Sequence, residues 1–161
     1  MHYSGSELVD IAKQIEAAGE AFYSAAMARV ADLRVREVLL YLRDEESRHA
    51  GTFERLLKGL DEPDGEWRVD ESYLGYMRVL ADRRVFPSPE AAVEAVARLD
   101  GEAALLEYAL AFEKDTILFL HELRSAIRPE SQALIDALVA EERNHVRAID
   151  RMLGALRAPG T

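Results

Sequence analysis

Two apolar stripes with helical spacing, each interrupted by a glutamate and a histidine, restrict this chain to a helical fold with a polar interior. Alternating steps of four and three residues give the first stripe: Leu42, Glu46, His49, Phe53 and Leu56. The same steps give the second stripe: Leu138, Glu142, His145, Ile149, Met152 and Leu156. This spacing lines one face of an α-helix. Each stretch is therefore expected to be a helix that turns a carboxylate and an imidazole toward the core.

An internal repeat relates the two stripes by a shift of 96 residues (142 − 46 = 96). The shift superposes Glu46 on Glu142, His49 on His145, and the preceding acid Glu45 on Glu141. Side chains at i and i+3 project side by side from a helix, so each copy presents its Glu and His together. The preceding acids lie about 100° off the stripe. We interpret them either as solvated groups or as groups that support the ligands.

Most of the remaining sequence also has helical periodicity. Four long helices are expected over residues 4–30, 33–58, 101–127 and 129–156. Residues 73–84 predict a short helix, and Ser88 begins a further helical segment that breaks at Asp100-Gly101. Residues 59–88 are too long for a tight turn and are expected to cross the length of the bundle. The sequence thus predicts an all-α, ferritin-like antiparallel four-helix bundle with one long crossover between its second and third helices.

Composition excludes several classes of protein. With 161 residues, 49% apolar and 31% charged, the chain suits one domain over 1–161 and is too apolar for disorder. No apolar run approaches the about 18–20 residues of a membrane span. The net charge of −10 argues against a nucleic-acid partner, and Arg83 and Arg84 are interpreted as a solvated pair. The absence of cysteine and of a secretory signal fits a cytoplasmic protein.

Carboxylates and imidazoles on core stripes need partners, because desolvation of a charge costs several kcal/mol. Two facing buried carboxylates would repel each other, and one would be protonated. Divalent or trivalent cations remove that conflict. Carboxylate and imidazole ligands without sulfur are typical of transition-metal sites. In such bundles the other two helices each supply one carboxylate.

The first and third long helices each contain a candidate for that carboxylate. The apolar stripe of the third helix has Glu113 at its centre. In the first helix the candidate is Glu20, although the periodicity is weaker there and Glu16 lies one turn away on the same side. Glu20 lies 11 residues before Ala31 and Glu46 lies 15 residues after it, so the two reach similar depths in an antiparallel pair.

Four segments together resemble the rubrerythrin family of ferritin-like di-iron proteins. They are Gly19-Glu20-Ala21-Phe22-Tyr23, Glu45-Glu46-Ser47-Arg48-His49-Ala50, Phe112-Glu113-Lys114-Asp115-Thr116-Ile117 and Glu141-Glu142-Arg143-Asn144-His145. The similarity covers all four long helices. A single Glu-x-x-His motif is a weak signal, whereas two in phase, with acids on the partner helices, are a strong one.

The resemblance implies a centre of two Fe ions, with Mn or Zn as alternative metals in the isolated protein. Its ligands would be two bridging carboxylates, two terminal carboxylates and two imidazoles: Glu46 and Glu142, Glu20 and Glu113, and His49 and His145. Tyr23 would be either a packing residue or a hydrogen-bond partner of this centre. No catalytic residue is expected beyond the metal centre itself.

Two departures from the rubrerythrin pattern bear on function. Members of the family carry a second carboxylate near the position of Glu113, which exchanges with a histidine on redox change. Here the residues three positions away are Leu110 and Thr116. The family's cysteine-rich rubredoxin module is also missing, because the chain has no cysteine. Electrons would therefore come from an external donor, rubredoxin-like or another reductant.

These observations predict a non-haem di-iron oxidoreductase of rubrerythrin type that reduces hydrogen peroxide or dioxygen. A ferroxidase, or an iron storage or delivery protein, is the alternative, favoured by the missing second carboxylate and the acidic charge. A third interpretation is a bundle with a structural metal. Amphipathic bundles of this class usually pair, so a homodimer or larger homo-oligomer is expected.

Overall fold

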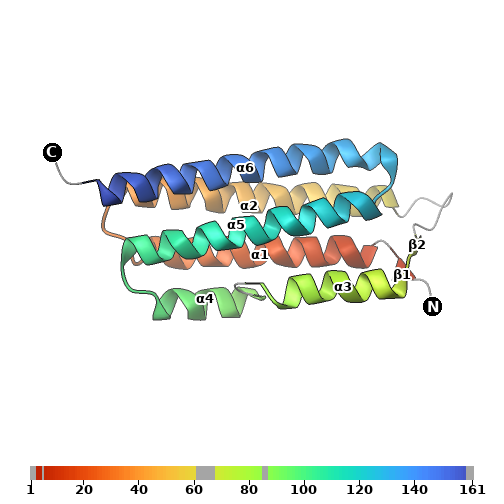
Figure 1. Ribbon diagram of the computed structural model, residues 1–161, viewed down its shortest axis with the longest axis horizontal. Coiled ribbons are helices and arrows are strands. Elements are labelled where there is room, and N and C mark those ends of the chain that lie inside the picture. Colours follow the sequence, from red (N-terminus) through yellow and green to blue (C-terminus); the bar gives the residue numbers. More distant parts are fainter. Residues whose placement is uncertain (1–2, 5, 61–67, 85–86, 159–161) are drawn as a thin grey trace.

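The computed structural model describes residues 3–4, 6–60, 68–84 and 87–158. Four long helices form the bundle: α1 (Ser6–Met27), α2 (Leu33–Leu60), α5 (Gly101–Ala126) and α6 (Pro129–Arg157). Short turns join α1 to α2 and α5 to α6, so each pair is an antiparallel hairpin (Figure 1). The long helices lie where the sequence predicts them, with ends that differ by a few residues.

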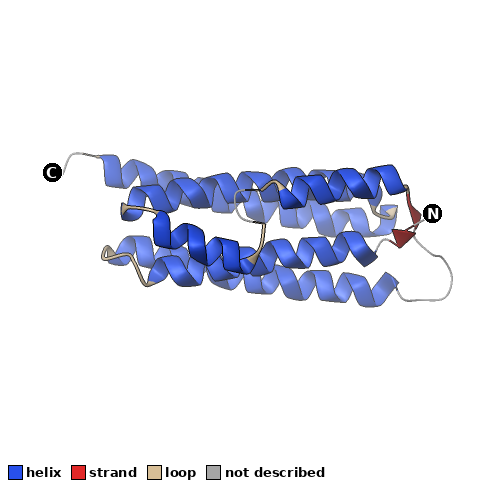
Figure 2. Cartoon of the chain, turned by 90° about the horizontal axis from the view of Figure 1, so that it is seen from below, coloured by secondary structure: helices blue, strands red, loops and turns tan. Residues whose placement is uncertain are grey.

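The crossover between the two hairpins contains two short helices, α3 (Glu71–Asp82) and α4 (Pro89–Arg98). They lie along the bundle beside α1, and α4 packs closely on it (Figures 1 and 2). Ser88 caps α4 by accepting a hydrogen bond from the amide of Ala91 at 3.2 Å. The break that the sequence predicts at Asp100-Gly101 separates α4 from α5, so α4 belongs to the connection between the two hairpins.

That break depends on the backbone of Gly101, whose φ of +81° lies in the left-handed region that favours glycine. Asp100 occupies the N-cap position of α5 but its side chain makes no capping hydrogen bond. In the turn between α1 and α2, Asp32 accepts a hydrogen bond from the amide of Arg34 at 2.8 Å, which stabilises the first turn of α2.

A pair of two-residue strands, β1 (Tyr3–Ser4) and β2 (Arg68–Val69), joins the start of the chain to the crossover. They are antiparallel, with Tyr3 opposite Val69. For this reason α1 begins at Ser6 and not at the predicted Ser4. Within the residues that the structure describes, no helix has the length and apolar character needed to span a lipid bilayer.

The core between the four long helices is apolar at both ends and polar in the middle. Phe22, Leu39, Phe119 and Ile149 are among its fully buried apolar side chains. Glu102 accepts hydrogen bonds at 2.7 Å from two amides of the α1–α2 turn, and so fixes that turn to the start of α5. The middle of the bundle is where acidic and imidazole side chains are buried.

Candidate metal centre

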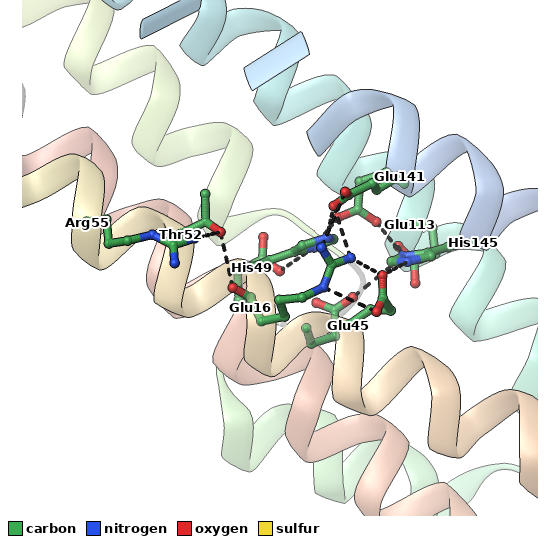
Figure 3. A network of polar contacts seen from close by, with 11 residues as sticks. Glu16, Glu45, His49, Thr52, Arg55, Glu113, Glu141 and His145 are labelled. Atoms are coloured by element: carbon green, nitrogen blue, oxygen red, sulfur yellow. Dashed lines mark hydrogen bonds and ion pairs between the residues drawn. The ribbon is translucent and has the colours of Figure 1, made fainter. Parts of the chain in front are cut away.

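Each long helix places one carboxylate at the centre of the bundle, and α2 and α6 each add an imidazole. The six residues are Glu16 from α1, Glu46 and His49 from α2, Glu113 from α5, and Glu142 and His145 from α6. All six are at most 1% exposed. Figure 3 shows Glu16, His49, Glu113 and His145 reaching the same region from four helices.

The six side chains form two overlapping sets of donors, each with its ligand atoms within 4.8 Å of one another. One set combines Glu16 and His49 with Glu46 and Glu142, and the other combines Glu113 and His145 with the same two carboxylates. Each set therefore has its own histidine and its own terminal carboxylate. Glu46 and Glu142 are shared, as expected for ligands that bridge two ions.

The structure corrects the predicted position on the first helix. Glu20 is exposed and takes no part in either donor set, whereas Glu16, one turn earlier, is buried at 1%. The signal was present in the sequence. Counted from Ala31, Glu16 lies 15 residues before it (31 − 16 = 15), which equals the distance to Glu46 after it (46 − 31 = 15).

The alternating four-and-three spacing of the other helices also selects Glu16. In α1 this spacing gives Ala12, Glu16, Gly19, Tyr23 and Ala26, all of which are buried. Small residues at three of these five positions leave the stripe without the large apolar side chains that mark the other helices. Glu20 lies off this stripe and faces the solvent.

Unpaired oxygen atoms show that the site fits metal ions. Among the described residues, both carboxylate oxygens of Glu46, Oε2 of Glu16 and Oε2 of Glu113 are buried without a hydrogen bond. Buried polar atoms without partners are costly and uncommon in proteins. The four carboxylates carry a charge of −4 when ionised, which two divalent cations would neutralise. The arrangement therefore fits a carboxylate-bridged di-metal site.

Both imidazoles turn their Nδ1 atoms toward the carboxylates. Nδ1 of His145 lies 2.8 Å from Oε2 of Glu142. Nδ1 of His49 lies 2.8 Å from the other carboxylate oxygen of Glu142, Oε1. The two rings are stacked, with centroids 5.5 Å apart and an interplanar angle of 19°. Nδ1 of His49 is also 3.4 Å from Glu16, and that of His145 is 3.6 Å from Glu113. Each terminal carboxylate is thus paired with one histidine.

The outer nitrogens of the imidazoles face the acids that precede the shared carboxylates. Nε2 of His49 lies 2.9 Å from Glu141, and Nε2 of His145 lies 3.8 Å from Glu45. Arg48, which is half exposed, forms ion pairs with both acids. Of the two interpretations of these acids, support of a ligand therefore agrees with the structure for Glu141. Glu141 hydrogen-bonds the histidine of the other copy of the repeat, a contact that fixes ring orientation at metal sites. Glu45 faces His145 without a hydrogen bond.

Tyr23 is a hydrogen-bond partner of the centre as well as a packing residue. Its hydroxyl is fully buried and donates to Oε1 of Glu113. Burial raises the pKa of Tyr23 well above its ordinary value, and the nearby charge of Glu113 raises it further. The phenol therefore stays protonated and remains a donor. Its ring also packs edge-on against Phe22 and Phe112.

In the metal-free protein, protons balance the charges of the cluster. Burial and the charge of Glu142 raise the pKa of Glu113 to about 8, and burial raises the pKa of Glu16 and Glu46 as well. Burial also acts to raise the pKa of Glu142, but hydrogen bonds from both imidazoles lower it below its ordinary value.

The two histidines are protonated for the opposite reason. Burial opposes their imidazolium forms, yet contacts with carboxylates raise the pKa of His49 to about 11 and that of His145 to about 10. Cations at the centre would replace these protons.

Arg84 differs from its interpretation as a solvated residue, because it is only 7% exposed. Its guanidinium carbon lies 5.3 Å from the centroid of the Phe112 ring, a cation–π contact. Burial lowers its pKa to about 10, against the opposing charges of Glu16, Asp115 and Glu46. The crossover therefore places a cation on the α1 and α5 side of the carboxylate cluster.

Comparison with known proteins identifies the fold. No family model and no curated protein matches the sequence. A solved structure from Thermotoga maritima, described as a ferritin-like diiron-carboxylate protein, superposes with a TM-score of 0.72, covering 95% of this chain and 96% of the other. The chain has the ferritin-like fold. The predicted ferritin-like bundle is confirmed, whereas at 22% identity the narrower assignment to the rubrerythrins stays a prediction.

Proposed function

We propose that this chain is a non-haem di-iron oxidoreductase that reduces hydrogen peroxide or dioxygen. The observation that carries the proposal is the pair of overlapping donor sets that share Glu46 and Glu142. Two histidines and four carboxylates bind two first-row transition metals in preference to Mg²⁺ or Ca²⁺, which take oxygen ligands. The similar structure supports the same class, since its description names a diiron-carboxylate protein.

The residues of the chain have separate tasks in this proposal. The shared carboxylates would hold two like-charged ions by neutralising part of their charge. Glu141 orients the His49 imidazole, Glu45 places a negative charge 3.8 Å from Nε2 of His145, and the Tyr23 hydroxyl holds Glu113. When bound, two ferrous ions would supply two electrons, the number needed to convert hydrogen peroxide and two protons to two water molecules. An external reductant then returns two electrons to the protein.

Metal analysis followed by rapid mixing tests this function. Protein loaded anaerobically should hold about two iron ions per chain, as expected for a ferritin-like di-iron bundle. Stoichiometric peroxide should then oxidise the bound iron faster than it oxidises free ferrous ion under the same conditions. Glu46→Gln and Glu142→Gln should lose both the metal and the reaction. Oxidation no faster than that of free ferrous ion would reject the proposal.

A ferroxidase or iron storage and delivery role is the second candidate. The residues three positions from Glu113 favour it: Leu110 is half-buried and Thr116 is buried, and neither supplies a second carboxylate for a peroxidase-type ligand exchange. Repeated additions of ferrous ion in air distinguish the two. Turnover well beyond the stoichiometric capacity, in a hollow many-subunit assembly, supports iron handling, whereas a homodimer without turnover supports the oxidoreductase.

A further inference from the structure

Gly19 occupies an unusual place in the interior of α1, one turn after Glu16. A Cβ atom built on Gly19 would lie 2.5 Å from Oε2 of Glu46 and 2.8 Å from two ring carbons of Phe112. Real Cβ atoms do not approach other atoms so closely. Any side chain larger than hydrogen would therefore overlap a shared carboxylate of the candidate metal centre.

Other helical glycines whose surroundings the structure describes are not constrained in this way. A Cβ atom at Gly51, Gly75 or Gly154 would meet nothing within 4 Å. Glycine in a helix interior is destabilising relative to alanine, because it loses more backbone entropy on folding. At Gly19 this loss coincides with close contact to Glu46, which indicates a role for the missing side chain.

Packing around Phe112 determines which neighbour would have to move. The Phe112 ring lies under the Arg84 guanidinium and edge-on to Tyr23, with a centroid distance of 6.4 Å to the latter ring. Neighbours on two sides limit any retreat of the ring. The carboxylate of Glu46 is the end of a flexible side chain, and neither of its oxygens is held by a hydrogen bond. The overlap would therefore be relieved mainly by displacement of Glu46.

We propose that Gly19 is a positioning residue for Glu46. Without a Cβ atom, α1 leaves room for the carboxylate at the place where the two donor sets share it. The glycine acts through Glu46 and not by touching a substrate. This inference rests on the proposed di-metal function and adds a determinant that lies outside the ligand set.

The test compares Gly19→Ala with Gly51→Ala, a matched control in α2. Metal-free protein is titrated anaerobically with Co²⁺, whose visible absorption bands report its ligand geometry, and unfolding in urea is measured separately. Gly19→Ala should weaken Co²⁺ binding by about 10- to 100-fold, the range for changes that misplace metal ligands, and should alter the absorption bands. Gly51→Ala should bind Co²⁺ as the wild type does. Equal Co²⁺ affinity and equal spectra for all three proteins would overturn the inference.

A second pair of variants keeps the test decisive if Gly19→Ala fails to fold. Phe112→Leu shortens the crowded ring, so Gly19→Ala in that background retains only the overlap with Glu46. Weaker Co²⁺ binding by the double variant than by Phe112→Leu alone supports the inference, and equal binding overturns it. Failure of the wild type to bind about two Co²⁺ ions, as a ferritin-like di-iron bundle would, rejects the proposed function instead. The two failures are therefore distinguishable.

Discussion

Single residues in this protein are buried or exposed according to their phase on the helix, and small shifts of phase change their chemistry. Glu16 and Glu20 are one turn apart on α1, yet Glu16 is in the carboxylate cluster and Glu20 faces the solvent. The sequence predicted five of the six clustered residues at their positions. The sixth was misplaced because Ala12, Gly19 and Ala26 give α1 a stripe of small residues, which a search for large apolar side chains does not detect.

The two glutamates of α1 provide a matched pair for mutation. Glu16→Gln should lower the bound divalent metal and weaken its affinity, because it removes a charged donor from one set. Glu20→Gln should leave both unchanged, since that side chain is exposed. Metal content after anaerobic loading and dialysis checks both variants. Loss of metal in Glu20→Gln but not in Glu16→Gln would contradict the site as described.

Tyr23→Phe isolates the hydrogen bond to Glu113. The substitution keeps the ring in the core and leaves a buried carboxylate oxygen without its donor. We expect a loss of about 1–3 kcal/mol in the free energy of unfolding of the metal-free protein, measured in urea. Tyr108→Phe, at a partly exposed position of α5, serves as the control and should change little. Equal stabilities of the two variants would show that the Tyr23 hydroxyl contributes nothing.

At the level of elements, α2 and α6 depend on each other through the acids that precede the shared carboxylates. Glu141 on α6 supports His49 on α2, and Glu45 on α2 faces His145 on α6. The repeat in the sequence predicted that these acids are equivalent. It did not predict which histidine each would contact, because that depends on how the helices are placed side by side.

The two contacts differ in length, and this difference predicts unequal effects. Nε2 of His49 is 2.9 Å from Glu141, whereas Nε2 of His145 is 3.8 Å from Glu45. Glu141→Gln should therefore weaken metal binding by about 10- to 100-fold, and Glu45→Gln should weaken it less. Competition with a chelator measures both, with Glu54→Gln on the exposed face of α2 as the control. The reverse order of effects would contradict this assignment.

The crossover was the element least accessible to sequence reasoning. Its short helix was predicted over residues 73–84 and lies at Glu71–Asp82, two residues earlier at each end, where Asp70 caps its first turn. The burial of Arg84 was not predicted, since a pair of arginines after a helix usually lies in solvent. Its position follows from the path of α3 along α1, which the pattern of residues near Arg84 does not encode.

For the whole molecule, the buried cluster makes stability depend on both pH and metal. Burial raises the pKa of Glu113 from 4.5 to about 8, so the folded metal-free protein binds a proton that the unfolded chain has released in this range. Stability from this group is fully present below pH 4.5 and is lost as the pH rises through about 8. The raised pKa values of His49 and His145 act in the same direction at higher pH.

Urea unfolding of the metal-free protein at pH 5, 6.5 and 8 should therefore show decreasing stability across the interval set by the shift of Glu113. Glu113→Gln, which cannot titrate, should flatten this dependence. A fixed concentration of metal should raise the free energy of unfolding most at the higher pH, because binding then displaces fewer protons. Where that concentration is 100 times Kd, the gain is about 2.7 kcal/mol per site. Metal-free protein that becomes more stable between pH 5 and 8 would contradict the proposed charge state.

Each half of the chain carries three of the six clustered residues. The hairpin of α1 and α2 provides Glu16, Glu46 and His49, and the hairpin of α5 and α6 provides Glu113, Glu142 and His145. Each half also lends one carboxylate to the other, so either hairpin alone would offer an ion only three side chains. A pair of ions with all six ligands would therefore link the two hairpins, which are otherwise joined covalently only through the crossover. Full metal binding would then indicate that the two hairpins have packed against each other.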